Sequence, residues 1–257
     1  MKFRTEISIP KAPWQITYQD KTALLGSCFS DNIAEKMKQY YFQVICNPTG
    51  TLYNPVSIAR HLEDEYVCDA DVVIITFGTA WVYVDKATNL VVDNCQKRPS
   101  SDFIRRRLSV DEIVDLWQPL VAKHADKRFI FTVSPIRHLK DGLHENNLSK
   151  GILLLAVEQL NAYYFPSYEI VLDDLRDYRF YSDDLMHPNQ AAINYIWEQF
   201  TATFMSESTQ REMKELNALW LNRHHRSLYP DSIADKEFKA RTDEQFRTLK
   251  ERYPWLS

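Results

Sequence analysis

Short apolar runs alternate with amphipathic segments over most of the chain, and this alternation predicts an α/β fold. The run Asp71–Phe77 is the strongest strand signal, because it is continuous and β-branched, as a central parallel strand is. Strands are expected at residues 23–25, 42–46, 71–77, 128–133 and 168–172. Five alternations of strand and helix predict a parallel five-stranded sheet with helices on both faces, a three-layer α/β/α domain of flavodoxin-like topology.

Helical periodicity fills most of the segments between these strands. Asn54 and Ser109 precede two of the helical patterns and are expected to cap them. Helices are expected at about residues 30–41, 55–65, 110–124, 149–164 and 188–204. The segments Trp81–Asp85 and Leu90–Asn94 predict a small hairpin, and residues 1–20 an irregular arm anchored by Trp14 and Ile16.

The last fifty residues are highly charged and helical in pattern, with apolar residues too sparse for an independent core. We therefore expect a main domain over residues 1–205 and a C-terminal helical extension over 206–257 that packs on it. An arm for oligomerisation or for a partner is the alternative.

Composition narrows the function classes. Of the 257 residues, 45% are apolar and 26% charged, as in soluble globular proteins, and the net charge of −4 argues against nucleic-acid binding. The first twenty residues lack the apolar core of a signal peptide and no run is long enough to span a membrane, so a cytoplasmic protein without membrane contact is expected. The four cysteines lack Cys-x-x-Cys spacing, which predicts no metal site. The phosphate-binding glycine motifs of nucleotide sites do not occur either, and no cofactor is expected.

The residues that could take part in catalysis or binding all follow predicted strands. They are Ser27, Gly50, Gly78, the pair Arg137 and His138, and the pair Asp184 and His187. In parallel sheets ligands bind outside the carboxyl ends of the strands, so we expect these groups to converge on one site.

Ser27 stands between the first strand and the first helix, directly after Gly26. Helix-terminal N–H groups at such a turn favour developing negative charge, so Ser27 is a candidate nucleophile with an oxyanion site beside it. A plain N-cap is the structural alternative. The neighbouring thiol of Cys28 is a second candidate nucleophile, although its apolar neighbours suit a buried thiol.

A serine nucleophile needs a base, and the base needs a carboxylate that fixes its tautomer. His187 lies three residues after Asp184 and directly before Pro188, at the start of the last helix of the main domain. A turn with this spacing can bring the carboxylate within hydrogen-bond reach of the imidazole Nδ1.

Residues 26–30, Gly-Ser-Cys-Phe-Ser, resemble the signature of the GSCFA family, with Ser30 in place of alanine. Members of that family resemble SGNH/GDSL hydrolases, and the resemblance extends over roughly residues 1–205. It implies a triad of Ser27, His187 and Asp184. It also implies an oxyanion hole to which Gly50 contributes, while Ala80 occupies the position of the usual asparagine donor in the turn that starts at Gly78. The replacements considered for that donor are Asn54, Thr79 and His138.

The activity implied by this resemblance is hydrolysis of an ester, an acyl or acetyl group on a carbohydrate-like or other polar small molecule, without metal or organic cofactor. Arg137 is expected either to bind the substrate or to pair with an acidic residue of the loop 173–184. The alternative function is a catalytically weak protein that binds a glycan or protein partner in the same cleft.

Overall fold

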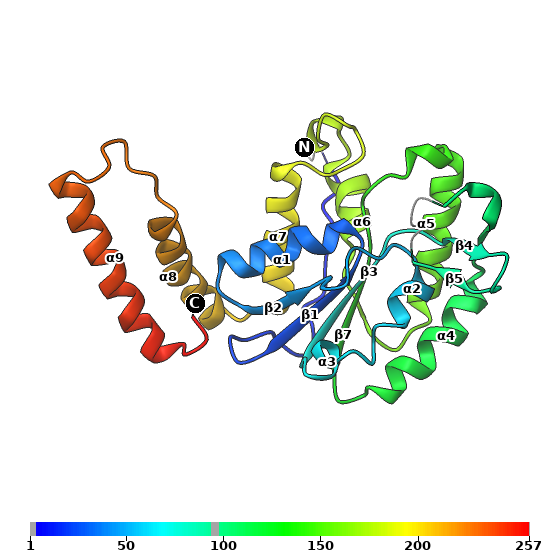
Figure 1. Ribbon diagram of the computed structural model, residues 1–257, viewed down its shortest axis with the longest axis horizontal. Helices are drawn as coiled ribbons and strands as arrows, with labels where there is room; N and C mark the ends of the chain where they lie inside the picture. Colours follow the sequence, from blue (N-terminus) through cyan, green and yellow to red (C-terminus); the bar gives the residue numbers. More distant parts are fainter. Residues whose placement is uncertain (1–3, 94–97, 257) are drawn as a thin grey trace.

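The computed structural model describes residues 4–93 and 98–256, and its centre is a five-stranded parallel sheet (Figure 1). The strand order is β2-β1-β3-β7-β8, which is the flavodoxin-like order predicted from the sequence. The strands are β1 (Lys21–Gly26), β2 (Gln43–Cys46), β3 (Val72–Phe77), β7 (Arg128–Val133) and β8 (Tyr163–Tyr164). Every residue of β3 is buried, as expected for a β-branched strand in the middle of a parallel sheet.

Helices cover both faces of the sheet and bury one apolar cluster on each side (Figure 1). On one face lie α1 (Cys28–Gln39) and α7 (Gln190–Phe204), together with a π-helix over Ile170–Leu175 that directly follows α6 (Ser167–Glu169). The opposite face carries α2 (Pro55–Ala59), α3 (Glu65–Cys68), α4 (Val110–Lys123) and α5 (Leu143–Glu158). The three-layer α/β/α architecture is therefore confirmed.

The fifth strand is not where the sequence placed it. Tyr168–Leu172 was expected to be a strand, but it lies in α6 and the π-helix, and the fifth strand is β8. Ile170 and Val171 are instead fully buried in the same apolar cluster as residues of α1 and α7. A short apolar run does not distinguish a buried strand from a buried helical turn, which explains the error.

Three helix boundaries also differ from the prediction. α1 begins at Cys28 and not at Ser30, because Ser27 is its N-cap. The helix expected over 55–65 is divided into α2 and α3. The helix expected over 149–164 is α5, which begins and ends about six residues earlier. Caps and turns decide these boundaries more than hydrophobic periodicity does.

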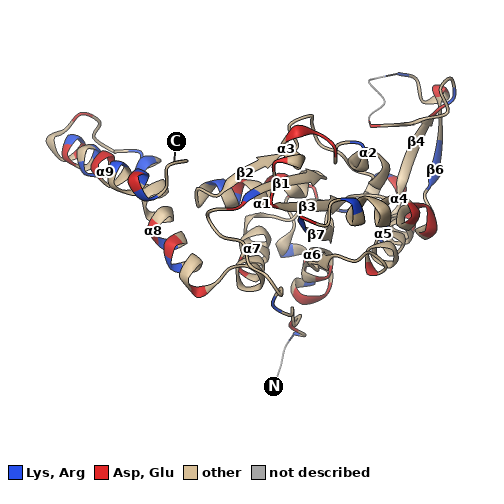
Figure 2. Ribbon diagram, turned by 90° about the horizontal axis from the view of Figure 1, so that it is seen from below, with Lys and Arg blue, Asp and Glu red and all other residues tan. Residues whose placement is uncertain are grey.

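The predicted hairpin is part of a three-stranded antiparallel sheet. Its strands are β4 (Trp81–Asp85), β5 (Val91–Val92) and β6 (Phe103–Arg107), and β6 was not predicted. The last residue of the expected strand Leu90–Asn94 lies outside the described residues. Three consecutive arginines, Arg105 to Arg107, give β6 its blue colour in Figure 2.

The N-terminal arm packs as expected, because Ile16 is fully buried and the Trp14 ring stacks on Phe204 at a centroid distance of 5.5 Å. At the other end of the chain, α8 (Glu207–Arg223) and α9 (Ile233–Arg252) project from the side of the domain (Figure 1). Leu216 and Leu219 of α8 are fully buried in the same cluster as α1 and α7.

Candidate active site

The central strands end together at the edge of the sheet where α1 begins. Gly26 of β1 lies opposite Thr76 of β3, and Phe77 lies opposite Val133 of β7. A Cβ atom on Gly26 would stand 2.2 Å from the Thr76 carbonyl oxygen, and the Gly26 φ of +136° is one that other residues rarely adopt. The β1–α1 turn therefore depends on glycine, and it places the start of α1 at this edge.

A cleft of about 450 Å³ opens at the same edge. It lies among the start of α1, the loop before α2, the small antiparallel sheet, the loop after β7 and the Met186–His187 turn. Of the residues predicted for the site, those that line it are Asn54, Thr79, Arg137, His138 and His187, and Cys28 lines it too.

His187 is held by Asp184, as the three-residue spacing predicts. The His187 Nδ1 lies 2.5 Å from Asp184 Oδ2, and Asp184 Oδ1 accepts from the N–H groups of Met186 and His187 at 2.9 and 3.0 Å. These two backbone N–H groups, followed by the imidazole, lower the pKa of Asp184 to about 2. An ionised Asp184 accepts the Nδ1 proton and leaves the Nε2 lone pair of His187 toward the cleft.

The Nε2 of His187 faces Cys28 rather than Ser27. The Cys28 Sγ lies 3.7 Å from His187 Nε2. Ser27 Oγ instead accepts from the Phe29 N–H at 3.3 Å as the N-cap of α1, and the residue is only 1% exposed. The structure thus brings Asp184 and His187 together as expected, and places Ser27 in the capping role that was its structural alternative.

Burial raises the pKa of the Cys28 thiol, an effect that nearby Asp31 adds to and Lys150 opposes. The Lys150 ammonium is itself buried, and its Nζ donates to the carbonyl oxygens of Gly78 at 2.6 Å and Ser134 at 2.7 Å. Burial lowers the Lys150 pKa to about 7. Lys150 therefore ties together the loops that follow β3 and β7, a role that sequence analysis missed.

The backbone N–H groups of the two glycines expected at the site are engaged elsewhere. The Gly50 N–H donates to the Asn47 carbonyl at 2.9 Å, and the Gly78 N–H donates to the Tyr53 carbonyl at 2.9 Å. Gly78 lets two chain segments pass closely, since a Cβ there would stand 2.9 Å from the Tyr53 oxygen. The structure therefore gives both glycines a role in holding loops.

Asn54 and Thr79 line the cleft but also make structural hydrogen bonds. Asn54 caps α2, with its Oδ1 accepting from the Ser57 N–H and its Nδ2 donating to Ser57 Oγ. Thr79 Oγ1 accepts from the Trp81 N–H at 3.1 Å and pairs with Ser149 Oγ at 3.0 Å.

One ring nitrogen of His138, a residue that lines the cleft, makes no hydrogen bond to the residues that the structure describes. Its Nε2 is buried and without a hydrogen-bond partner among the described residues, while its backbone N–H donates to Asn146 Oδ1 at 2.9 Å. Burial, assisted by the charge of Lys150, lowers the His138 pKa to about 4. The imidazole is therefore neutral at pH 7, and in the Nε2–H tautomer it is a hydrogen-bond donor without a protein acceptor.

Arg137 contacts the Asp184 loop without the acidic partner that was one of the two roles expected for it. Its guanidinium lies over the rings of Tyr178 and Tyr181, at 5.6 and 5.4 Å from their centroids, and its NH1 donates to the Leu185 carbonyl. No ion pair between Arg137 and residues 173–184 occurs in the part of the chain that the structure describes.

The β6 strand supplies one wall of the cleft through Arg105, which sequence analysis missed. Arg105 lies over the Trp81 ring at 4.0 Å and pairs with Asp141 of the loop after β7. Neighbouring Arg107 pairs with Glu145 at 2.7 Å. The segment Phe103–Arg107 has two apolar residues followed by three arginines, so it shows no alternation of apolar and polar residues that would have predicted a strand.

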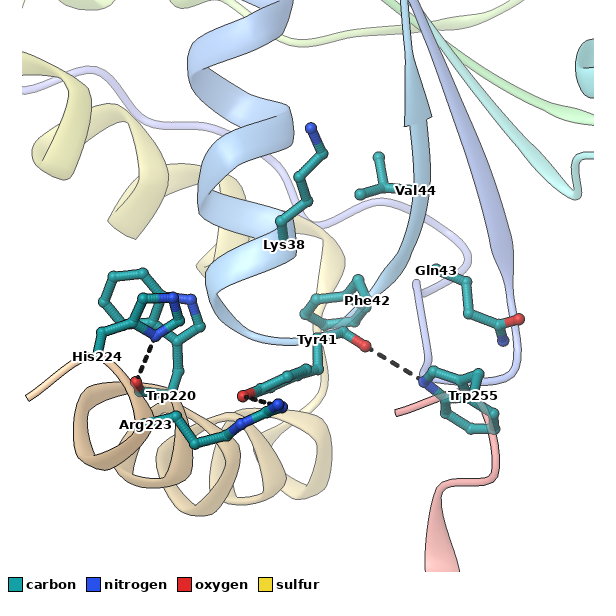
Figure 3. A pocket seen from close by; sticks show the side chains of 9 residues that line it. All are labelled: Lys38, Tyr41, Phe42, Gln43, Val44, Trp220, Arg223, His224 and Trp255. Carbon is teal, nitrogen blue, oxygen red and sulfur yellow. Dashed lines mark hydrogen bonds between the residues drawn. The ribbon is translucent and has the colours of Figure 1, made fainter. Parts of the chain in front are cut away.

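A larger cavity, of about 570 Å³, lies between α1, β2 and the C-terminal segment (Figure 3). Trp255 Nε1 donates there to the Tyr41 carbonyl at 3.2 Å, and the Trp220 and His224 rings stack 4.1 Å apart. The cavity lies where α1 ends and β2 begins, away from the edge that holds His187. We place the candidate active site in the smaller cleft, because it contains the Asp184–His187 pair.

Within residues 4–93 and 98–256, no three His, Cys, Asp or Glu side chains are grouped closely enough to hold a metal ion. None of the helices there has the length and apolar character needed to cross a membrane.

Comparison with known proteins finds one matching family. The model of the GSCFA family matches residues 21–67 and 63–200. A search of curated proteins found no similar sequence.

Several solved structures are similar to this chain. A catalytic mutant of an acetylxylan esterase from Geobacillus stearothermophilus is 12% identical, with a TM-score of 0.47 over 75% of this chain and 97% of that one. A putative lipolytic protein of the G-D-S-L family from Desulfitobacterium hafniense is 12% identical, with a TM-score of 0.45 over 72% of this chain and 99% of that one. A GDSL-like lipase from Bacteroides thetaiotaomicron is 14% identical, with a TM-score of 0.46 over 76% of this chain and 89% of that one.

Proposed function

The chain belongs to the GSCFA family, and we propose that it hydrolyses an ester of a polar, carbohydrate-like substrate in the cleft at the start of α1. The observation that carries this proposal is the Asp184–His187 pair at the cleft, with Nδ1 bound to the carboxylate and Nε2 directed at the β1–α1 turn. A base fixed in this tautomer can take a proton from a nucleophile and return it to a leaving alcohol.

In the proposed reaction, His187 Nε2 removes the proton of a nucleophile in the Ser27–Cys28 turn as that nucleophile attacks the ester carbonyl. The carbonyl oxygen becomes an oxyanion near the start of α1, where the first N–H groups of the helix have no intrahelical acceptor. His187 then protonates the departing alkoxide, and water releases the acyl group in a second round of the same steps.

The substrate class follows from the walls of the cleft. Tyr53 and Tyr83 line it and are 41% and 37% exposed, so the exposed parts of their rings can pack on a sugar face, with Arg105 lying 5.7 Å from the Tyr83 ring centroid. One face of Trp81 is occupied by Arg105. Lys140 and Asp93 add charged groups at the same cleft, which suits a polyhydroxylated scaffold better than a long acyl chain.

The test is release of acetate by the wild-type protein from p-nitrophenyl acetate and from acetylated oligosaccharides. We expect both to be hydrolysed, with kcat/KM for the oligosaccharides reduced in Tyr83→Ala and kcat/KM for p-nitrophenyl acetate little changed. Absence of acetate release from either substrate would contradict the proposal.

A second candidate function is binding of a glycan in this cleft without hydrolysis. It is favoured by Ala80, whose side chain cannot donate to an oxyanion, and by the engaged N–H of Gly50. Loss of one oxyanion donor costs about 10²–10³ in rate. Saturable binding of oligosaccharides without acetate release would support this second function.

A further inference from the structure

Within the described part of the chain, the nucleophilic atom in contact with His187 Nε2 is a sulfur. Cys28 lines the cleft, and its Sγ stands 3.7 Å from His187 Nε2, within the range of a hydrogen bond to sulfur. From this geometry we propose that Cys28, and not Ser27, is the nucleophile and is acylated during the reaction. This inference rests on the proposed function, which it makes more specific.

Ser27 is unsuited to the role of nucleophile because its hydroxyl caps α1 and its side chain is closely packed. Its Oγ accepts from the Phe29 N–H and caps α1, and its own N–H donates to the Thr76 carbonyl at 3.3 Å. On the other side, a Cβ added to Gly78 would lie 3.3 Å from Ser27 Cβ, which shows how closely the end of β3 packs on this side chain. Attack by Ser27 Oγ would require the cap to open and the side chain to leave this packing.

The position of Cys28 at the first residue of a twelve-residue helix suits the intermediate that its attack would generate. Its N–H lies where the helix offers no acceptor, next to the carbon that Sγ would attack. The unpartnered Nε2 of His138 lines the same cleft and is a second donor for the oxyanion when it carries the proton.

Each step balances. The Cys28 S–H proton passes to His187 Nε2 as Sγ bonds to the carbonyl carbon, whose π electrons move to the oxygen. When the oxyanion collapses, the carbon–oxygen bond of the ester breaks and the alkoxide takes the proton from His187. The thioester on Cys28 is then attacked by water, whose proton passes to His187. Collapse of the second oxyanion expels the Cys28 thiolate, which recovers that proton from His187.

Because burial raises the pKa of the Cys28 thiol, the resting protein holds a neutral thiol rather than a thiolate. Proton removal by His187 therefore belongs to the attack itself. Alkylation of Cys28 by iodoacetamide should accordingly depend on His187, and it should be slower in His187→Ala than in the wild type.

The experiment quenches the protein during reaction with p-nitrophenyl acetate and locates the acetyl group by peptide mass spectrometry. It is done on the wild type, Cys28→Ala, Ser27→Ala and Cys68→Ala, with ester turnover of each recorded in parallel. Cys68→Ala is the matched control, because Cys68 is an exposed thiol outside the cleft.

We expect an acetyl group on Cys28 in the wild type and in Ser27→Ala, a loss of turnover of about 10³-fold or more in Cys28→Ala, and turnover within a few-fold of wild type in Cys68→Ala. A Cys28→Ala protein that keeps turnover, or an acetyl group on Ser27, would overturn the inference while leaving ester hydrolysis intact. An acetyl group that accumulates on Cys28 without acetate release would uphold the nucleophile and refute the hydrolysis. Absence of both acetylation and turnover would refute the two together.

Discussion

Asp184 contacts His187 twice, through its Oδ2 to the imidazole Nδ1 at 2.5 Å and through its Oδ1 to the backbone N–H at 3.0 Å. The carboxylate thus fixes both the turn and the tautomer of the side chain on that turn. The base is built by four consecutive residues, which is why a three-residue spacing in the sequence was enough to find it.

Asp184→Asn should lower turnover of p-nitrophenyl acetate by about 10²-fold or more, because an amide does not hold His187 in the Nδ1–H tautomer as a carboxylate does. The matched control is Asp183→Asn, which removes the adjacent carboxylate and should leave turnover within a few-fold of wild type. Equal losses in two folded variants would place the orienting carboxylate elsewhere.

Gly26→Ala should prevent the β1–α1 turn from forming, since the added Cβ would stand 2.2 Å from the Thr76 oxygen at a φ of +136°. Gly151→Ala is the control, because Gly151 lies inside α5 with nothing within 4 Å of a Cβ. Thermal denaturation should show a severe loss for the first variant and a gain of about 0.5–1 kcal/mol for the second. A Gly26→Ala protein as stable as the wild type would contradict this reading of the turn.

Lys150→Met should destabilise the protein although methionine suits a buried position. The substitution leaves the carbonyl oxygens of Gly78 and Ser134 without the donor they have in the native protein. Each buried acceptor left unsatisfied costs about 1–3 kcal/mol. Lys123→Met removes an exposed lysine paired with Glu63 and should cost at most about 1 kcal/mol. Chemical denaturation gives the unfolding free energy of both variants. Similar losses for Lys150→Met and Lys123→Met would contradict a structural role for the buried hydrogen bonds of Lys150.

His138 should make stability fall as the pH is lowered. Its pKa in the folded protein is about 4, below the ordinary value of 6.5, so between these values the unfolded chain binds a proton that the folded protein does not. The contribution of His138 to the free energy of unfolding is therefore constant above pH 6.5. It declines by on the order of 3 kcal/mol as the pH falls from 6.5 to about 4. His138→Gln should flatten the slope of unfolding free energy against pH in this window. An unchanged slope would refute the assignment.

The sequence predicted the central sheet because its signal is local. The residues of β3 from Val72 to Thr76 are all β-branched, and a strand buried on both faces needs little else to be recognised. The fifth strand was predicted at the wrong place because its signal is not local. The pairing of Tyr163 with Ile130 depends on β7, far away in the chain. Ile170 and Val171 are apolar because they are buried in the same cluster as residues of α1 and α7.

The candidate site shows the same division. His187 and Asp184 were found from spacing, and their contact is confirmed by the geometry of one turn. The preference for Ser27 over Cys28 could not be decided by sequence, since it depends on which side chain caps α1 and which one faces a loop 159 residues later. Arg105 and Lys150 were missed because their partners lie in other elements of the fold.

The account centres on His187 as the base of an ester hydrolase, and comparison of two histidine variants tests it most directly. His61 is the matched control, because its Nδ1 also contacts a carboxylate, Asp64 Oδ2 at 2.7 Å, outside the cleft. With kcat/KM for p-nitrophenyl acetate measured on both, His187→Ala should fall by about 10³-fold or more while His61→Ala stays within a few-fold of wild type. Equal values for His187→Ala and the wild type would contradict the account.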